Sequence, residues 1–209
     1  MKIEKVAAQP DRAGRYTVQW EDGSVMRLYR QTVEDFCLYA GKEMDEARMA
    51  ELRVAAGQMS AKMRAVRIVS ASNVSKVDLQ HRLIQKGESK EDAQKAVDWM
   101  AEMQLLDDAK TAEQVVRSCI AKGYGLARAK QALYEKRIPK HYWGDALADY
   151  PDQQEKILSF LQNKLGESWT EKDLRRTIDA LLRRGHSYPE IRKALQLFSE
   201  DSAIGEEDV

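Results

Sequence analysis

The sequence predicts a mainly α-helical fold, with tandem repeats of short helices in an elongated array and a small β-hairpin or sheet at the N-terminus. Three observations predict it. A helix–glycine–helix pattern occurs three times, in residues 83–97, 119–133 and 181–195. Around these segments apolar residues recur every three or four positions, which is the period of a helix. Before residue 40 apolar and polar residues alternate instead, which is the period of a strand.

Residues 1–44 form the predicted β-rich extension. The stretch RYTVQWEDGSVMRLYR alternates on both sides of EDGS, which predicts a hairpin with Asp22 and Gly23 in its turn. The apolar residues of this pattern are Val18 and Trp20 on one arm and Val25 and Leu28 on the other. Residues 2–8 are candidates for a third strand. So small a sheet needs a packing partner, and the apolar residues around 33–38 are the expected one.

The last copy of the repeated pattern shows why its glycine is there. Leu174, Ile178 and Leu181 mark one apolar face of a helix, and Thr170 is a suitable N-cap for it. Gly185 follows the last turn of that helix. The chain usually closes a helix there in a left-handed conformation, which strains a residue with a Cβ by about 1–2 kcal/mol. The segment therefore predicts a helix, a tight turn and a second helix.

The other two copies follow the same rule. Gly87 and Gly123 end the first helix of their pairs, and Asp107 or Asp108 is predicted to begin the middle pair. A capping Ser follows the glycine in the first and last copies, whereas the middle copy has Gly125 in that place. An apolar residue stands ten positions after the glycine in every copy: Val97, Leu133 and Leu195.

These patterns define the predicted domain organisation. Residues 45–199 are expected to form the tandem helical repeats, at about 57–103, 107–149 and 151–199. From Glu200 to Asp208 the chain carries five acids and no base. Residues 200–209 are therefore expected to be an acidic, disordered tail.

Composition places the protein among soluble, helix-rich chains. Of its 209 residues one third are charged and only four are proline. No stretch approaches the roughly 20 apolar residues of a membrane span, and the N-terminus lacks the apolar core of a secretion signal. We expect a monomeric cytoplasmic protein that does not bind membranes.

The net charge is zero, but the charges are unevenly distributed. Residues 117–143 hold seven Lys or Arg against the single acid Glu135, and aromatic residues are interleaved with these bases. Such a segment is suited to phosphate groups or to an acidic protein surface. The alternative interpretation is an ordinary solvated helix surface. The candidate partner-binding residues are Arg117, Lys122, Arg128, Lys130, Lys136, Arg137 and Lys140.

The sequence shows no pattern typical of catalysis. His81, His141 and His186 fall in different repeats, without further ligands at metal-binding spacing. The glycines follow helices rather than strands, so they do not form a phosphate-binding loop. The acidic pair Asp107–Asp108 is best explained as a helix cap. We expect no metal, no cofactor and no enzymatic activity.

In order and spacing, the motifs of this chain resemble the RecX family, whose members regulate the bacterial recombinase RecA. The similarity rests on SKVDLQHRLIQKG, LLDDA, VVRSCIAKG, ARAKQALYEKRIP and DLRRTIDALLRRGHSYPEIRKAL, in that order. The family usually has a glycine where this chain has Arg137. The hairpin and the segment QTVEDFCLYAGKEMDEARMAEL are similar to the N-terminal extension of the Gram-positive branch.

The resemblance implies three-helix repeats and a non-enzymatic function. A RecX-like protein would lie in the groove of the RecA–single-stranded-DNA filament and inhibit its growth and its recombinase and coprotease activities. Single- or double-stranded DNA is a possible further contact. The alternative function is a helical DNA-binding protein that acts directly on nucleic acid. Only residues 126–137 offer it an exposed basic recognition helix.

Overall fold

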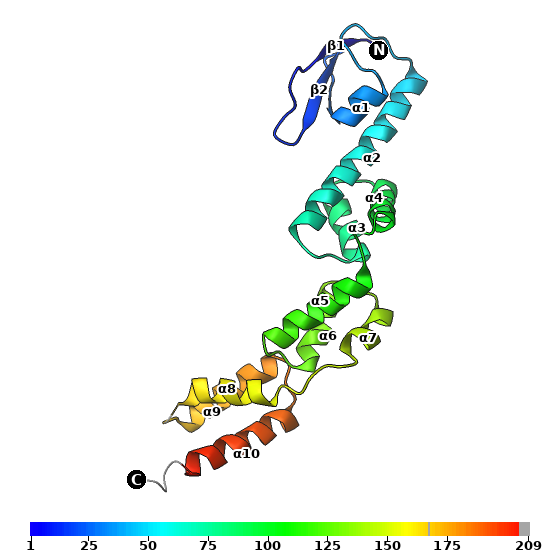
Figure 1. Cartoon of the computed structure of the whole chain (residues 1–209). Coiled ribbons are helices and arrows are strands. Elements are labelled where there is room, and N and C mark those ends of the chain that lie inside the picture. Colours follow the sequence, from blue (N-terminus) through cyan, green and yellow to red (C-terminus); the bar gives the residue numbers. More distant parts are fainter. Residues whose placement is uncertain (167, 205–209) are drawn as a thin grey trace. The chain divides into compact units, whose positions relative to one another are not determined.

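The computed structural model in Figure 1 is mainly helical and carries one small three-stranded sheet, which confirms the predicted fold class. It describes residues 1–166 and 168–204. The chain divides into two compact units, Met1–Leu106 and Asp107–Val209. The elongated stacking of the repeats and their boundaries stay predictions.

The first unit begins with the sheet, which confirms the predicted hairpin and adds the third strand. Strands β1 (Ile3–Val6), β2 (Arg15–Trp20) and β3 (Val25–Tyr29) pair antiparallel in the order β1-β2-β3. The turn between β2 and β3 contains Gly23 at φ +80°. Asp22 accepts hydrogen bonds there from the backbone and the hydroxyl of Ser24.

One apolar residue of the hairpin arms does not face the core. Val18, Trp20 and Leu28 are buried, but Val25 is 54% exposed. Val25 pairs with Gln19, whereas Met26 pairs with Val18 on the face that packs against the core. Residues three apart on a strand point to opposite faces, so Val25 and Leu28 cannot both be buried.

Two apolar cores fill the first unit. Its helices are α1 (Arg30–Asp35), α2 (Glu46–Ala71), α3 (Lys76–Gln85) and α4 (Lys90–Glu102). The first core lies between the sheet, α1 and the start of α2, where Met49 and Leu52 are buried. The second lies between the remainder of α2, α3 and α4. The long helix α2 therefore contributes to both cores.

Small residues let α2 approach α4 closely. Ala61 and Ala65 of α2 and Ala93 and Ala96 of α4 are fully buried in the second core. A Cβ on Gly57 of α2 would lie 2.8 Å from Oδ2 of Asp92. The apolar stripe of α2 at this end is thus made of alanine rather than of its larger methionines, since two helix backbones come close only where side chains are short.

The second unit is entirely helical in the residues described there. It consists of α5 (Asp108–Ala121), α6 (Leu126–Glu135), the 3-10 turn η1 (Lys140–Tyr142), α7 (Trp143–Leu147), α8 (Gln154–Leu165), α9 (Glu171–Arg183) and α10 (Tyr188–Ile204). One core lies among α5, α6 and α7, and another among α8, α9 and α10. Helix α10 includes the first five residues of the predicted acidic tail, and residues 205–209 lie outside the described residues.

The repeated glycine turns have the predicted conformation. Gly87, Gly123 and Gly185 follow α3, α5 and α9 with φ values of +91°, +64° and +86°. The predicted caps are also present, since Asp107 accepts from the backbone N–H of Lys110 and Thr170 accepts from that of Asp173. These contacts satisfy groups that a helix end leaves unpaired.

Two of these turns pack directly against each other within the second unit. The turn junction consists of Lys122–Gly125, between α5 and α6, and Arg184–His186, between α9 and α10. The backbone N–H of Gly125 donates to the carbonyl of Arg184 at 2.9 Å, and that of Ala127 donates to Gly185 at 3.3 Å. A Cβ on Gly125 would lie 2.1 Å from the carbonyl oxygen of Gly185. Gly125 is therefore required by a close approach of two backbones and not by its own φ.

Side chains satisfy three successive carbonyls at the turn junction. Arg184 donates to the carbonyl of Lys122, His186 Nε2 donates to that of Gly123, and Tyr150 donates to that of Tyr124, at 2.8, 3.0 and 2.6 Å. Burial lowers the pKa of His186 and raises the pKa of Tyr150 to about 12, so both stay neutral near pH 7. The end of α5 is thereby fixed to the elements that follow it.

Candidate partner-binding surface

The seven predicted binding residues lie along α5, α6 and the segment that follows α6. Arg117 is on α5, and Lys122 is at its C-terminal end. Five of the seven side chains belong to exposed residues, and those of Arg128 and Lys136 are partly buried. Their positions are Arg117 and Lys122 at α5, Arg128 and Lys130 on α6, and Lys136, Arg137 and Lys140 after it.

Arg117 and Arg128 are paired with acids. Arg117 contacts Glu113 at 3.2 Å, and Arg128 contacts Glu135 at 2.9 Å. The hydrogen bond from Arg128 lowers the pKa of Glu135, and the same contact raises the pKa of Arg128. Exposed pairs of this kind contribute little to stability, but they reduce the positive charge that the surface offers. Glu135, the single acid of residues 117–143, is used in this way.

The end of α6 brings bases and aromatic rings together. A hollow of about 560 Å³, named here the α6 hollow, is lined by Tyr134, Arg137, Lys140 and Trp143 among others. Tyr134 is 72% exposed, and Trp143 is held by a 3.0 Å hydrogen bond from Nε1 to the carbonyl of Ile138. Aromatic rings beside cations, here one exposed and one half-buried, suit both a nucleic-acid strand and a protein hot spot. Two of the seven predicted bases meet in this hollow.

Arg137 has an unusual backbone conformation. Its φ is +53°, the left-handed value that Gly87, Gly123 and Gly185 adopt after their own helices. Ile138 then donates to the carbonyl of Leu133 at 3.0 Å, which closes α6 as the glycine turns close theirs. An arginine in this conformation costs about 1 kcal/mol relative to glycine. Such local strain at an exposed cation marks a candidate functional residue.

Lys122 lines a different hollow, of about 250 Å³, at the turn junction. Lys156 of α8 and Arg184 line it as well. The guanidinium of Arg184 lies over the rings of Tyr124 and Phe160, at 5.3 and 4.9 Å from their centroids. Of the seven predicted bases, Lys122 thus lines this hollow, whereas Arg137 and Lys140 line the α6 hollow. Sequence reasoning missed Lys156, which comes from another helix, and it took Arg184 as part of an ordinary basic helix surface.

A further basic cluster lies in the first unit. Residues 62–86 hold six Lys or Arg against the single acid Asp78, a density close to that of residues 117–143. Four of these bases surround a hollow of about 460 Å³, named here the α2–α3 hollow: Arg64, Arg67, Arg82 and Lys86. Sequence reasoning missed this cluster, although the same count of bases and acids over residues 62–86 would have found it.

The acidic pair and the possible metal ligands of the sequence can now be placed in the structure. Asp107 is occupied as the N-cap of α5, as predicted. Among the described residues, no three His, Cys, Asp or Glu side chains lie close enough to hold a metal ion. In that same part of the chain, none of the helices has the length and apolar character that a bilayer crossing requires.

Comparisons with known proteins identify the family. Residues 107–147 match the model for the second three-helix domain of RecX. The regulatory protein RecX of Neisseria gonorrhoeae is 30% identical over 107 residues, which are 51% of this chain and 69% of that protein. The chain belongs to the RecX family. The resemblance found in the sequence is thereby confirmed.

Other RecX proteins extend the similarity. The regulatory protein RecX of Vibrio parahaemolyticus is 28% identical over 146 residues, covering 68% of this chain and 94% of that protein. A crystal structure described as regulatory protein RecX shares the fold, with a TM-score of 0.61 over 95% of this chain and 98% of that one, at 21% identity. The chain therefore has a RecX-type regulatory role. The RecX domain match contains α5, α6, η1 and α7, and with them all seven predicted bases.

Proposed function

We propose that this protein is a non-enzymatic regulator that binds the RecA–single-stranded-DNA filament and inhibits its growth and its recombinase and coprotease activities. Membership of the RecX family supports a regulatory role, and the α6 hollow supports binding as its means. The observation that carries the proposal is the α6 hollow inside the matched RecX domain, which is lined by the exposed Tyr134, Arg137 and Lys140 and by the half-buried Trp143.

Binding alone is sufficient for inhibition. A ligand shifts an equilibrium by the difference between its affinities for the two states. A protein that binds a non-extending form of the filament 100-fold more tightly than the growing form shifts that equilibrium by up to about 2.7 kcal/mol. No bond has to be made or broken.

The test is a titration of cognate RecA on single-stranded DNA, with ATP hydrolysis and co-sedimentation as the measurements. We expect inhibition at or below a one-to-one ratio with RecA. Arg137→Gly combined with Lys140→Gln should weaken binding about fivefold for each phosphate contact removed at about 0.1 M salt. Glycine is the residue best suited to the φ of position 137, so this variant should keep its fold.

Arg175→Gln is the matched control. Arg175 lies on α9 of the same unit, and its side chain is 75% exposed and paired with Glu171. The Arg175→Gln variant should inhibit RecA as strongly as the unaltered protein does. If the unaltered protein leaves RecA activity unchanged, the proposal is wrong; if the Arg137/Lys140 variant inhibits fully, the α6 hollow is not the binding surface.

The alternative, a helix–turn–helix reader of duplex DNA, is less favoured by the structure. A recognition helix contacts base edges with its N-terminal residues. At the start of α6, the N–H groups of Gly125 and Ala127 bond to the α9–α10 turn, and Arg128 is paired with Glu135. The first turn of the helix that would have to enter the groove is therefore already partly covered.

A further inference from the structure

The α2–α3 hollow is a basic site that the matched RecX domain does not include. Arg64 and Arg67 line it from α2, Arg82 lines it from α3, and Lys86 lies at the C-terminal end of α3. Its lining also contains Ile68 and Ser72. The site lies within the first unit, so its geometry depends only on how α2 and α3 pack.

Two buried carboxylates orient two of the four cations. Glu88 contacts Arg64 at 2.9 Å, and Asp78 contacts Arg82 at 2.8 Å. The acid side chains are only 8% and 10% exposed, whereas their arginine partners are 33% and 36% exposed. The acids therefore lie on the protein side and the guanidinium groups on the solvent side. The buried acid fixes each arginine, and a second donor is used within the protein, by the carbonyl of Lys86 for Arg64 and by the hydroxyl of Ser72 for Arg82. A guanidinium has five N–H donors, so each arginine keeps others for an anion.

The other two cations have no acidic partner in the part of the chain that the structure describes. These are Arg67 and Lys86. Four cations are thus opposed by two carboxylates, and two positive charges stay uncompensated. An anion that enters the hollow meets net positive charge and needs to displace no existing ion pair.

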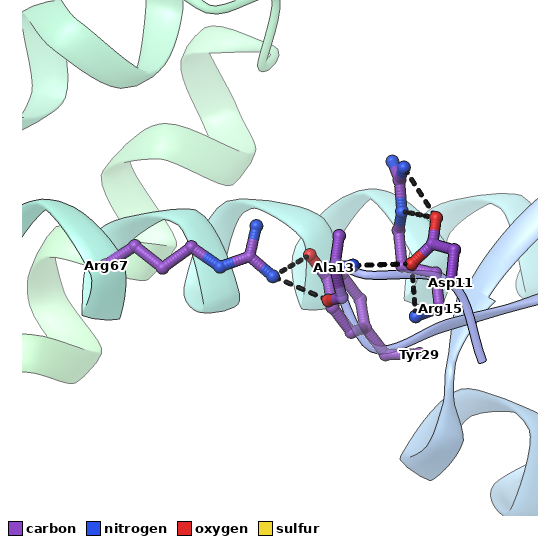
Figure 2. Close-up of polar contacts among 5 residues, drawn as sticks. All are labelled: Asp11, Ala13, Arg15, Tyr29 and Arg67. Carbon is purple, nitrogen blue, oxygen red and sulfur yellow. Dashed lines mark hydrogen bonds and ion pairs between the residues drawn. The ribbon is translucent and has the colours of Figure 1, made fainter.

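Arg67 is held in place by uncharged partners. Figure 2 shows one terminal nitrogen of its guanidinium donating both to the carbonyl of Ala13, at 2.6 Å, and to the hydroxyl of Tyr29, at 3.3 Å. The other terminal nitrogen points away from these partners and carries no contact in the view. The Ala13 loop is itself ordered by Asp11, which binds Arg15 and the N–H of Ala13. Arg67 has therefore lost much of its rotamer freedom before any ligand binds, and this lowers the entropic cost of binding.

The donor set is suited to phosphate. Guanidinium groups present planar pairs of N–H donors that match the oxygens of phosphate groups. The residues that line the hollow include no aromatic ring on which a free nucleotide base would stack, and no glycine-rich loop that would enclose a triphosphate. An open hollow with spread cations and a short apolar surface fits the backbone of a strand.

We propose that the α2–α3 hollow binds phosphodiester groups of a nucleic-acid strand through Arg64, Arg67, Arg82 and Lys86. This inference goes beyond the proposed function, because it assigns to the first unit a direct contact with nucleic acid that needs no RecA. Its failure would leave the binding of the second unit to the RecA filament untouched.

The test is fluorescence anisotropy of a labelled oligothymidine with the full chain, in the absence of RecA and over a series of salt concentrations. For single strands each phosphate contact contributes about 0.7 to the slope of log affinity against log salt concentration. Arg67→Gln combined with Lys86→Gln should therefore lower that slope by about 1.4 and weaken binding about 25-fold at about 0.1 M salt. Lys86→Gln alone, which leaves the Ala13 loop intact, should weaken binding about fivefold.

Arg53→Gln combined with Lys5→Gln is the matched control, since both residues are exposed in the same unit and neither lines the hollow. It should bind like the unaltered protein. The proposal is overturned if Lys86→Gln binds with unchanged affinity and slope, or if the control loses as much as the test variants. Binding of inorganic pyrophosphate with no binding of the oligonucleotide would overturn the assignment to a strand.

Discussion

Gly125→Ala is expected to destabilise the second unit by about 2–6 kcal/mol, although the φ of residue 125 is ordinary. The added Cβ would lie 2.1 Å from the carbonyl oxygen of Gly185, whereas side-chain carbons in folded proteins stay beyond 3.0 Å. The two turns would have to separate by about 1 Å. That movement breaks the hydrogen bonds that Gly125 and Ala127 donate, each contributing about 0.5–1.5 kcal/mol, and the steric overlap adds about 1–3 kcal/mol.

Urea denaturation followed by circular dichroism measures the loss, and hydrogen exchange shows where it occurs. We expect faster exchange at the amides of Gly125 and Ala127 and little change in the first unit. Gly144→Ala, in the same unit, is the control. A Cβ there meets no atom within 4 Å, so lower chain entropy in the unfolded state should stabilise the protein by about 0.5–1 kcal/mol. A loss below about 0.5 kcal/mol for Gly125→Ala would refute the argument from backbone contact.

Two further predictions concern single side chains. Arg137→Gly should raise the free energy of unfolding by about 1 kcal/mol in a urea titration, because φ +53° strains arginine and not glycine; unchanged or lower stability would show that contacts of the side chain outweigh the strain. His186 faces Arg184, Glu190 and the carbonyl of Gly123, and burial lowers its pKa below the ordinary 6.5. Its contribution to stability is complete above pH 6.5 and is lost as the pH falls from 6.5 through the folded-state pKa. The urea midpoint should therefore decrease as the pH is lowered over that range. His186→Gln, which keeps an N–H donor, should remove the share of this decrease that comes from His186. The same pH dependence in both proteins would contradict this assignment.

Local signals were predictable from the sequence because their causes are local. The left-handed turns at Gly87, Gly123 and Gly185 follow from how any helix closes, and the caps at Asp107 and Thr170 follow from unpaired N–H groups at helix starts. Family membership was predictable for the same reason, since it rests on the order of these local motifs.

Features that depend on distant residues were not predictable. The sequence marks Gly125 only as the place where the other copies have a capping serine, while the reason for a glycine is a backbone about 60 residues away. The α2–α3 hollow needs cations from two helices, and a linear scan centred on residues 117–143 passes over it. The exposure of Val25 has a simpler reason, because an apolar residue three positions from the buried Leu28 lies on the opposite face of the strand.

The long helix α2 couples the two apolar cores of the first unit. Its 26 residues extend for about 39 Å, and it inserts Met49 and Leu52 into the core beside the sheet and Ala61 and Ala65 into the core beside α4. Because one helix belongs to both cores, detachment of the sheet would expose the apolar residues in the first turns of α2 to water. The sheet thus covers the N-terminal end of α2. A protein truncated at residue 45 would begin with a helix whose apolar face is exposed.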